Sequence, residues 1–173
     1  MTEVPGLKPE WRWETWYPKG EADPLVGALG EILFVFGELE HLVKDWTVQL
    51  LGAGARGYVA LRGHQFGQSV DILIGIAEKS PEIPPDQLSR LVAWGQRAKD
   101  AANERNKVIH AKWAPSEEHP PNWRRIRQPR KGEFVTSELV SIADIQRVRD
   151  ITIAVLGEGA QLCSRVVAGK GTA

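Results

Sequence analysis

The side chains best suited to chemistry lie in the stretch ERNKVIHAKW, residues 104–113, which contains Arg105, Asn106 and His110. The planar guanidinium of arginine can hold a phosphate group through two parallel hydrogen bonds. Histidine titrates near neutral pH and can therefore accept or donate a proton during a reaction. An asparagine beside them can orient the histidine or a phosphate oxygen by hydrogen bonding. These residue types predict a candidate site for phosphate binding and proton transfer.

A helix must position these side chains. It is predicted to begin near Asp86, a good N-cap residue, and to end near Trp113, because Pro115 keeps Ala114 out of the α conformation. The small residues at the centre of its apolar stripe would let another helix approach closely, from the same chain or from a second copy. At about 100° per residue, the stripe consists of Leu91, Gly95, Ala98, Ala102, Ile109 and Trp113.

The polar residues are predicted to border this stripe. Arg105 falls on one side, whereas Asn106 and His110 fall on the other, where Lys99 and Asn103 extend the same polar ridge. Arg105 and His110 lie about 140° apart, so they meet within one chain only if the arginine side chain wraps around the helix. A symmetric pair of such helices would bring two arginines and two histidines to one groove, which predicts a homodimer.

Three other helices are predicted from apolar residues that recur three and four positions apart. The first runs from about residue 25 to the glycines at 52 and 54, and the second covers the apolar run from Phe66 to before Pro81. The last begins at a Ser141 cap with Asp144 in the capping-box position and continues to about residue 168. With the helix from Asp86 they predict an all-α fold, an antiparallel four-helix bundle over residues 25–168.

Three segments are predicted to differ from these helices. Residues 1–24 form an irregular N-terminal arm, because four prolines resist helix formation, and three tryptophans would pin the arm to the domain or stack on bases. Residues 115–136 are a polar insertion with a short β-hairpin around QPRKG, between the third and fourth helices. Residues 169–173 are a flexible tail.

The insertion contains further candidate residues, in the run NWRRIRQPRK. A charged run is usually a solvated surface, but an aromatic ring beside several cations can also follow an RNA backbone. The candidate RNA contacts are Trp123, Arg124, Arg125, Arg127, Arg130 and Lys131, together with Lys99 and Asn103 on the helix.

The composition limits the class of protein. Its 22 basic and 22 acidic side chains give no net charge, so a nucleic-acid contact must come from a local patch. The single cysteine, Cys163, excludes an intrachain disulfide, and the scattered histidines predict no metal site. The chain has no signal-peptide pattern and no long apolar span, which predicts a cytoplasmic protein without a membrane anchor.

The stretch RNKVIH resembles the R-x(4-6)-H motif of the HEPN (higher eukaryote and prokaryote nucleotide-binding) superfamily, in which a polar residue follows the arginine. Its position late in the third of four helices is similar as well, although Ala111 stands where many relatives have glycine. The resemblance implies that Arg105, Asn106 and His110 form a metal-independent endoribonuclease site without a cofactor, assembled from both subunits of a dimer.

Two functions are therefore expected. The first is cleavage of single-stranded RNA to 2′,3′-cyclic phosphate and 5′-hydroxyl ends, by a toxin or antiphage defence factor that an antitoxin protein could neutralise. The second is a non-catalytic module that binds RNA, a nucleotide or a partner protein, or only stabilises a dimer. In that case Arg105 is a helix-edge residue bonded to a glutamate, and His110 caps the end of its helix.

Overall fold

The computed structural model describes residues 24–119, 122–127 and 136–170. Helices make up 74% of these residues, which confirms the predicted helical class. The elements are α1 (Pro24–Leu51), α2 (Gly54–Ala60), α3 (Phe66–Glu78), α4 (Pro85–Ile109), β1 (Lys112–Pro115), β2 (Trp123–Arg127), β3 (Thr136–Val140) and α5 (Ile142–Lys170). The predicted arm up to residue 23, the hairpin turn at 128–135 and residues 171–173 lie outside the described residues.

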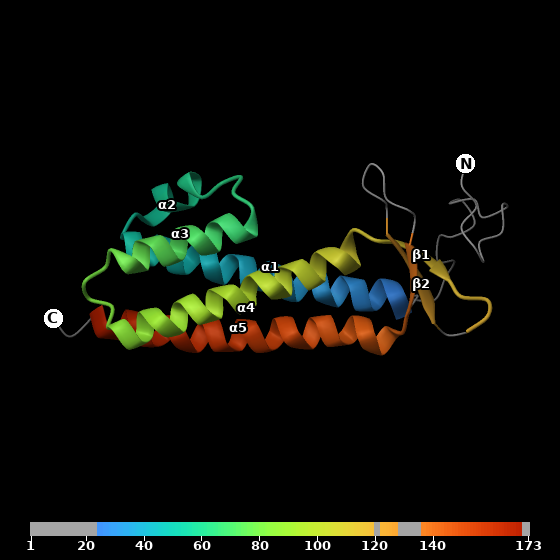
Figure 1. Cartoon of the computed structure of the whole chain (residues 1–173). Helices are drawn as coiled ribbons and strands as arrows, with labels where there is room; N and C mark the ends of the chain where they lie inside the picture. Colours follow the sequence, from blue (N-terminus) through green and yellow to red (C-terminus); the bar gives the residue numbers. More distant parts are fainter. Residues whose placement is uncertain (1–23, 120–121, 128–135, 171–173) are drawn as a thin grey trace.

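The long helices α1, α4 and α5 run side by side, as Figure 1 shows. The most extensive helix contacts are those of α1 with α5, α4 with α5, α3 with α4, and α1 with α3. The shorter α2 and α3 lie over one half of this assembly, and the strands lie at its opposite end. At that end α1 and α5 begin and α4 finishes, so the last turn of α4 is placed next to the sheet.

Two apolar clusters hold these elements together. The larger cluster contains the buried Trp46 and Trp94, whose rings are 5.7 Å apart, and Trp94 Nε1 donates a 2.8 Å hydrogen bond to the Val155 carbonyl. The smaller cluster lies at the sheet end and consists of Leu25, Ala28, Ile32, Val108, Trp113, Val140, Ile145 and Val148. Strand residues and helix ends therefore share one core beneath the sheet.

The ends of two helices follow the sequence prediction. Gly52 and Gly54 have φ angles of 60° and 50°, in the left-handed region that favours glycine, and they end α1 as expected. The short helix α2, which follows at once, was not predicted from the glycine-rich sequence. At the start of α5, the Asp144 amide donates to Ser141 Oγ at 3.2 Å, and Asp144 Oδ2 accepts from the Ser141 amide at 3.1 Å. This reciprocal pair confirms the predicted capping box.

The predicted end of the helix near Trp113 is wrong, because α4 ends at Ile109 with His110 as its C-cap. Residues 112–115 instead form β1, which pairs antiparallel with β2 from Lys112↔Ile126 to Pro115↔Trp123. The Trp113 ring folds back, and its Nε1 donates a 3.0 Å hydrogen bond to the Val108 carbonyl, one of the carbonyls left free at the helix end. Pairing with β2 and the hydrogen bond from the Trp113 indole are thus favoured over another turn of helix.

The predicted two-stranded hairpin is also incomplete. The strands form a three-stranded antiparallel sheet in the order β1-β2-β3, in which Trp123↔Val140 and Arg127↔Thr136 mark the limits of the β2–β3 pairing. The strand that was not predicted is β1, which overlaps the predicted end of the helix and is too short to identify as a strand from its sequence pattern.

The small-residue stripe of α4 is occupied by the same chain. A Cβ atom added to Gly95 would lie 2.8 Å from Ile74 Cδ1 and 3.0 Å from Val70 Cγ1, both side chains of α3. Leu91, Ala98 and Ala102 are buried as predicted, but Ile109 is only half-buried. The stripe therefore explains the close packing of α3 on α4 and gives no support to a contact between two copies.

Candidate functional site

A groove of about 960 Å³ separates the last turns of α4 from strands β2 and β3. Its helix side is formed by Asp100, Asn103, Glu104, Asn106, Lys107, His110 and Ala111. Its sheet side is formed by Arg125, Ile126, Thr136, Ser137 and Glu138. The groove thus brings together parts of the two candidate groups that are separated in the sequence, the helix end and the basic insertion.

Asn106 and His110 both line this groove, one turn apart and exposed. The His110 amide donates a 3.2 Å hydrogen bond to the Asn106 carbonyl, which closes the final turn of α4. His110 is the C-cap of α4, and it is an exposed residue of the groove lining. The structure therefore places the predicted proton-transfer residue and its polar neighbour on one accessible surface.

Arg105 does not line the groove. Its guanidinium carbon lies 4.9 Å from the centre of the Phe36 ring, and Phe36 in turn packs against Phe66 at 4.9 Å. The guanidinium still reaches its neighbour, because Arg105 Nη1 donates a 2.9 Å hydrogen bond to Asn106 Oδ1. This bond presents the Asn106 amide Nδ2 as the group that can donate to a ligand. Arg105 therefore acts on the groove through Asn106.

The predicted polar ridge is divided between two surfaces. Asn103 lines the groove, but Lys99 forms an ion pair with Asp71 of α3 and does not belong to the groove lining. Lys99 therefore connects α4 to α3, and the ridge that reaches the groove is shorter than predicted.

The basic insertion is also divided between the groove and other surfaces. Arg125 lines the groove, whereas Arg124 is paired with Glu118 and does not line it. Trp123 is half-buried and packs against the smaller apolar cluster. Arg127 ends β2, and Arg130 and Lys131 lie outside the described residues.

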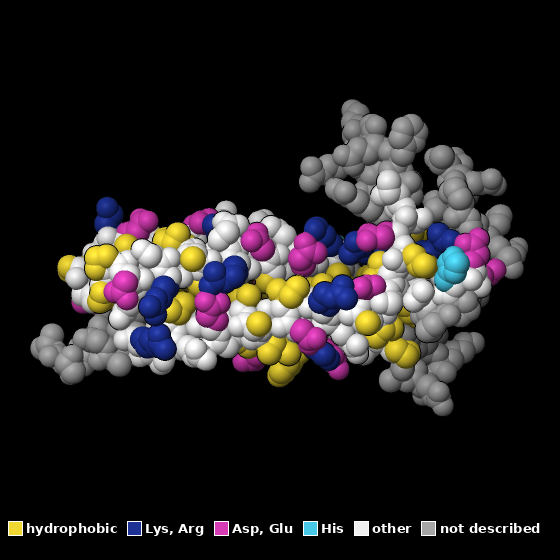
Figure 2. All heavy atoms as spheres, turned by 60° about the horizontal axis from the view of Figure 1, so that its bottom comes forward, with side chains coloured by type: hydrophobic (Ala, Val, Ile, Leu, Met, Phe, Trp, Pro, Cys, Tyr) yellow, Lys and Arg dark blue, Asp and Glu magenta, His cyan; other side chains and the backbone are white. Residues whose placement is uncertain are grey.

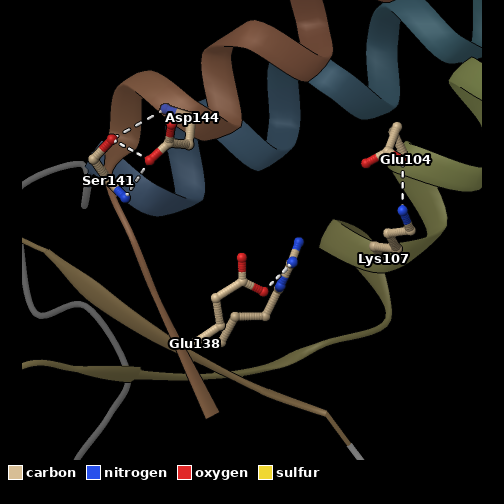
Figure 3. A network of polar contacts seen from close by, with 6 residues as sticks. Glu104, Lys107, Glu138, Ser141 and Asp144 are labelled. Atoms are coloured by element: carbon tan, nitrogen blue, oxygen red, sulfur yellow. Dashed lines mark hydrogen bonds and ion pairs between the residues drawn. The ribbon is translucent and has the colours of Figure 1, made fainter. Parts of the chain in front are cut away.

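The cations of the groove have acidic partners. Lys107 Nζ and Glu104 Oε1 are 2.5 Å apart on α4, and Arg125 Nη2 and Glu138 Oε2 are 2.5 Å apart across β2 and β3. Figure 3 shows Glu104 and Lys107 on α4 and Glu138 on the sheet, and all three residues line the groove. A phosphate that enters the groove therefore competes with a carboxylate for either cation.

On the face that Figure 2 shows, acidic and basic side chains are interspersed along the helices. Within the described ranges, no group of three or more His, Cys, Asp or Glu side chains could hold a metal ion. None of the described helices combines the length and apolar character needed to cross a lipid bilayer.

The sequence did not predict several residues of the groove, among them Lys107, Thr136, Ser137 and Glu138. Glu138 is directly opposite Arg125 in the β2–β3 register. Opposite charges on facing strand positions are a recognised stabilising pair, so a correct register would have identified this contact. The register was not predictable, because it depends on the length of the turn between the strands.

Comparison of the chain with family models, with curated proteins and with solved structures gives no match. The chemistry of the groove is therefore inferred from its own residues.

Proposed function

We propose that this protein is a metal-independent endoribonuclease of the HEPN type that cleaves single-stranded RNA in the groove between α4 and the sheet. The observation that carries the proposal is that His110, Asn106 and Arg125 line one groove, in which Arg105 orients Asn106. The proposal takes α1, α3, α4 and α5 as the antiparallel four-helix bundle of such a domain.

The proposed reaction needs three functions. A base removes the proton of a ribose 2′-hydroxyl, whose oxygen attacks the adjacent phosphorus, and an acid donates a proton to the departing 5′-oxygen. Cations and hydrogen-bond donors stabilise the charge that develops on the phosphate oxygens. His110 suits a proton-transfer step, and the amide of Asn106 suits a phosphate oxygen. The products are a 2′,3′-cyclic phosphate and a 5′-hydroxyl.

The second proton-transfer group is proposed to come from a second copy of the chain. Each chain contributes one histidine, His110, to the groove lining described above. A two-fold dimer that faces the ends of two α4 helices would bring both His110 residues to one RNA strand, one as base and one as acid. A role as a toxin or defence factor, with an antitoxin protein as partner, belongs to the same proposal.

The test is RNA cleavage by the full-length protein in excess EDTA, with the ends of the products identified. We expect cleavage to persist without metal, and His110→Ala to reduce the rate by about 100-fold or more, the usual contribution of a general acid or base. His41→Ala is the matched control, because His41 is exposed on α1 outside the groove. Absence of cleavage by the folded wild-type protein on several single-stranded RNAs would refute the enzyme.

The alternative function is a non-catalytic module that binds RNA or a nucleotide in the same groove. The orientation of Arg105 over Phe36 favours it, because the guanidinium does not line the groove where a reacting phosphate would lie. Binding of RNA that His110→Ala leaves unchanged, without cleavage by the wild type, would support this alternative.

A further inference from the structure

The ion pair between Arg125 and Glu138 lies in the groove opposite the helix that carries His110. The two residues face each other across β2 and β3. The Arg125 side chain is only 21% exposed, whereas the Glu138 side chain is 64% exposed. The arginine is thus held by the sheet, and its carboxylate partner is the member of the pair that can move into solvent.

The guanidinium group binds carboxylates and phosphates with the same paired geometry. An ion pair with an exposed partner contributes little net stability, because water and salt replace it readily. A phosphate can therefore take the place of the Glu138 carboxylate on Arg125 at small cost. It would then lie in the groove that Asn106 and His110 line from the other side.

We propose that Arg125 is the phosphate-binding arginine of the groove, and that Glu138 is an internal substitute for phosphate that an RNA backbone displaces. This inference rests on the proposed function, since it assigns the substrate phosphate to a position in that groove. In this arrangement Glu138 weakens the binding of any ligand that cannot compete with a carboxylate for Arg125.

The other cations near the groove fit this role less well. Arg105 points toward Phe36, and Lys107 pairs with Glu104 one helical turn away on the same exposed face. Lysine also offers a point charge without the planar fork that holds two phosphate oxygens. Arg125 is the arginine that both lines the groove and is fixed by a strand on each side.

Arg124 provides a closely matched control. It is the preceding residue of β2, it is 20% exposed, and its partner Glu118 is 64% exposed, at an Nη2–Oε2 distance of 2.6 Å. The two ion pairs thus have nearly the same exposure and length, but Arg124 does not line the groove. A general effect of removing a strand arginine would appear equally in both variants.

The experiment measures binding of a fluorescently labelled single-stranded RNA by anisotropy, over a range of salt concentrations. All variants are made in full-length protein with His110→Ala, so that cleavage does not alter the probe. We expect Arg125→Ala to weaken binding about tenfold, as for one charge-assisted contact. The slope of log affinity against log salt should fall by about 0.7, the value for one phosphate contact on a single strand.

The remaining variants complete the test. Glu138→Gln should strengthen binding several-fold, whereas Glu118→Gln and Arg124→Ala should leave it unchanged. Arg125→Lys should keep the salt slope and recover only part of the affinity, because it retains the charge and loses the fork. Thermal unfolding of each variant checks that the sheet is intact.

The outcomes separate the inference from the proposed function. If RNA binds and Arg125→Ala behaves like Arg124→Ala, the inference is wrong while the RNA-binding groove remains. Tight binding that Glu138→Gln weakens would also overturn it, because the carboxylate would then be part of the binding site. If neither the wild type nor any variant binds RNA, the proposed function fails, and the inference fails with it.

Discussion

Arg105 shows how the surroundings of one side chain decide what it can do. Its guanidinium stacks on Phe36 and donates to Asn106, while its Nε is buried without a hydrogen-bond partner among the described residues. A buried donor without a partner is costly, and the contact with an aromatic ring offsets part of that cost. The side chain therefore lies against Phe36 of α1, where it positions Asn106 without lining the groove itself.

The prediction at the residue scale concerns Ser141, whose hydroxyl and amide donate to the Asp144 carboxylate at the start of α5. Ser141→Ala should lower the free energy of unfolding by about 1 kcal/mol at pH 7, the usual effect of losing an N-cap. Hydrogen bonds from Ser141 lower the pKa of Asp144 below its ordinary value of 3.8. Urea unfolding at a series of pH values measures the difference between variant and wild type.

The lowered pKa of Asp144 determines how the stability of the protein changes with pH. A carboxylate whose pKa is lowered by folding stabilises the protein above its unfolded pKa, and this stabilisation is lost as the pH falls through the folded value. The difference between wild type and Ser141→Ala should therefore shrink below about pH 4. Ser164→Ala is the control, because Ser164 donates to the Gln161 carbonyl within α5 and binds no carboxylate. An equal response of both variants to pH would contradict the capping role.

At the scale of elements, the packing of α5 depends on one glycine. A Cβ atom added to Gly159 would lie 2.6 Å from Trp94 Cζ2 and 2.8 Å from Leu42 Cδ2. Trp94 has little freedom to yield, because it is fully buried and bonded to the Val155 carbonyl. Gly159 therefore sets the distance at which α5 can approach α1 and α4.

Gly159→Ala should accordingly destabilise the protein by about 1–3 kcal/mol, the range for an overpacked core. The matched control is Gly157→Ala, because nothing lies within 4 Å of a Cβ atom at Gly157. That change should be neutral or stabilise the protein by up to about 1 kcal/mol through helix propensity. Denaturant midpoints of the two variants in one buffer give the comparison, and equal midpoints would show that Trp94 and Leu42 can move aside.

At the scale of the whole molecule, the groove joins two regions with separate cores. The larger cluster holds α1, α3, α4 and α5 together, and the smaller one holds the sheet against the helix ends. The groove lies beside the smaller cluster, where α4 has ended and the strands begin. Residues of the groove are therefore positioned by the sheet as much as by the helices.

The prediction at this scale concerns the dimer. If two His110 residues serve one RNA strand, an excess of full-length His110→Ala should draw wild-type chains into mixed dimers that lack one histidine. The activity of a fixed amount of wild type should then fall at least tenfold below its value alone, because one proton-transfer group is missing. Light scattering of the same samples measures the mass. Undiminished activity, or a monomeric mass at the assay concentration, would contradict the shared site.

The helical class, the break at Gly52 and Gly54, and the Ser141–Asp144 cap were all predictable from the sequence. Each depends on residues within a few positions of one another, where backbone preferences and side-chain-to-backbone hydrogen bonds act locally. The apolar spacing likewise identified the buried positions Leu91, Ala98 and Ala102 before their partner was known. The spacing of apolar residues along one helix is thus enough to indicate which of its faces is buried.

Only the tertiary structure decided where α4 ends, which helix fills its small-residue stripe and which arginine enters the groove. Lys112–Pro115 form a strand and not a further turn of α4, because β2 (Trp123–Arg127) offers its backbone for pairing. Gly95 accepts α3, and Arg125, but not Arg124, lines the groove that His110 also lines. These outcomes depend on contacts between distant segments, whose register and orientation no local pattern specifies. The sequence by itself determined the chemical groups available, and the fold determined which of them share a groove.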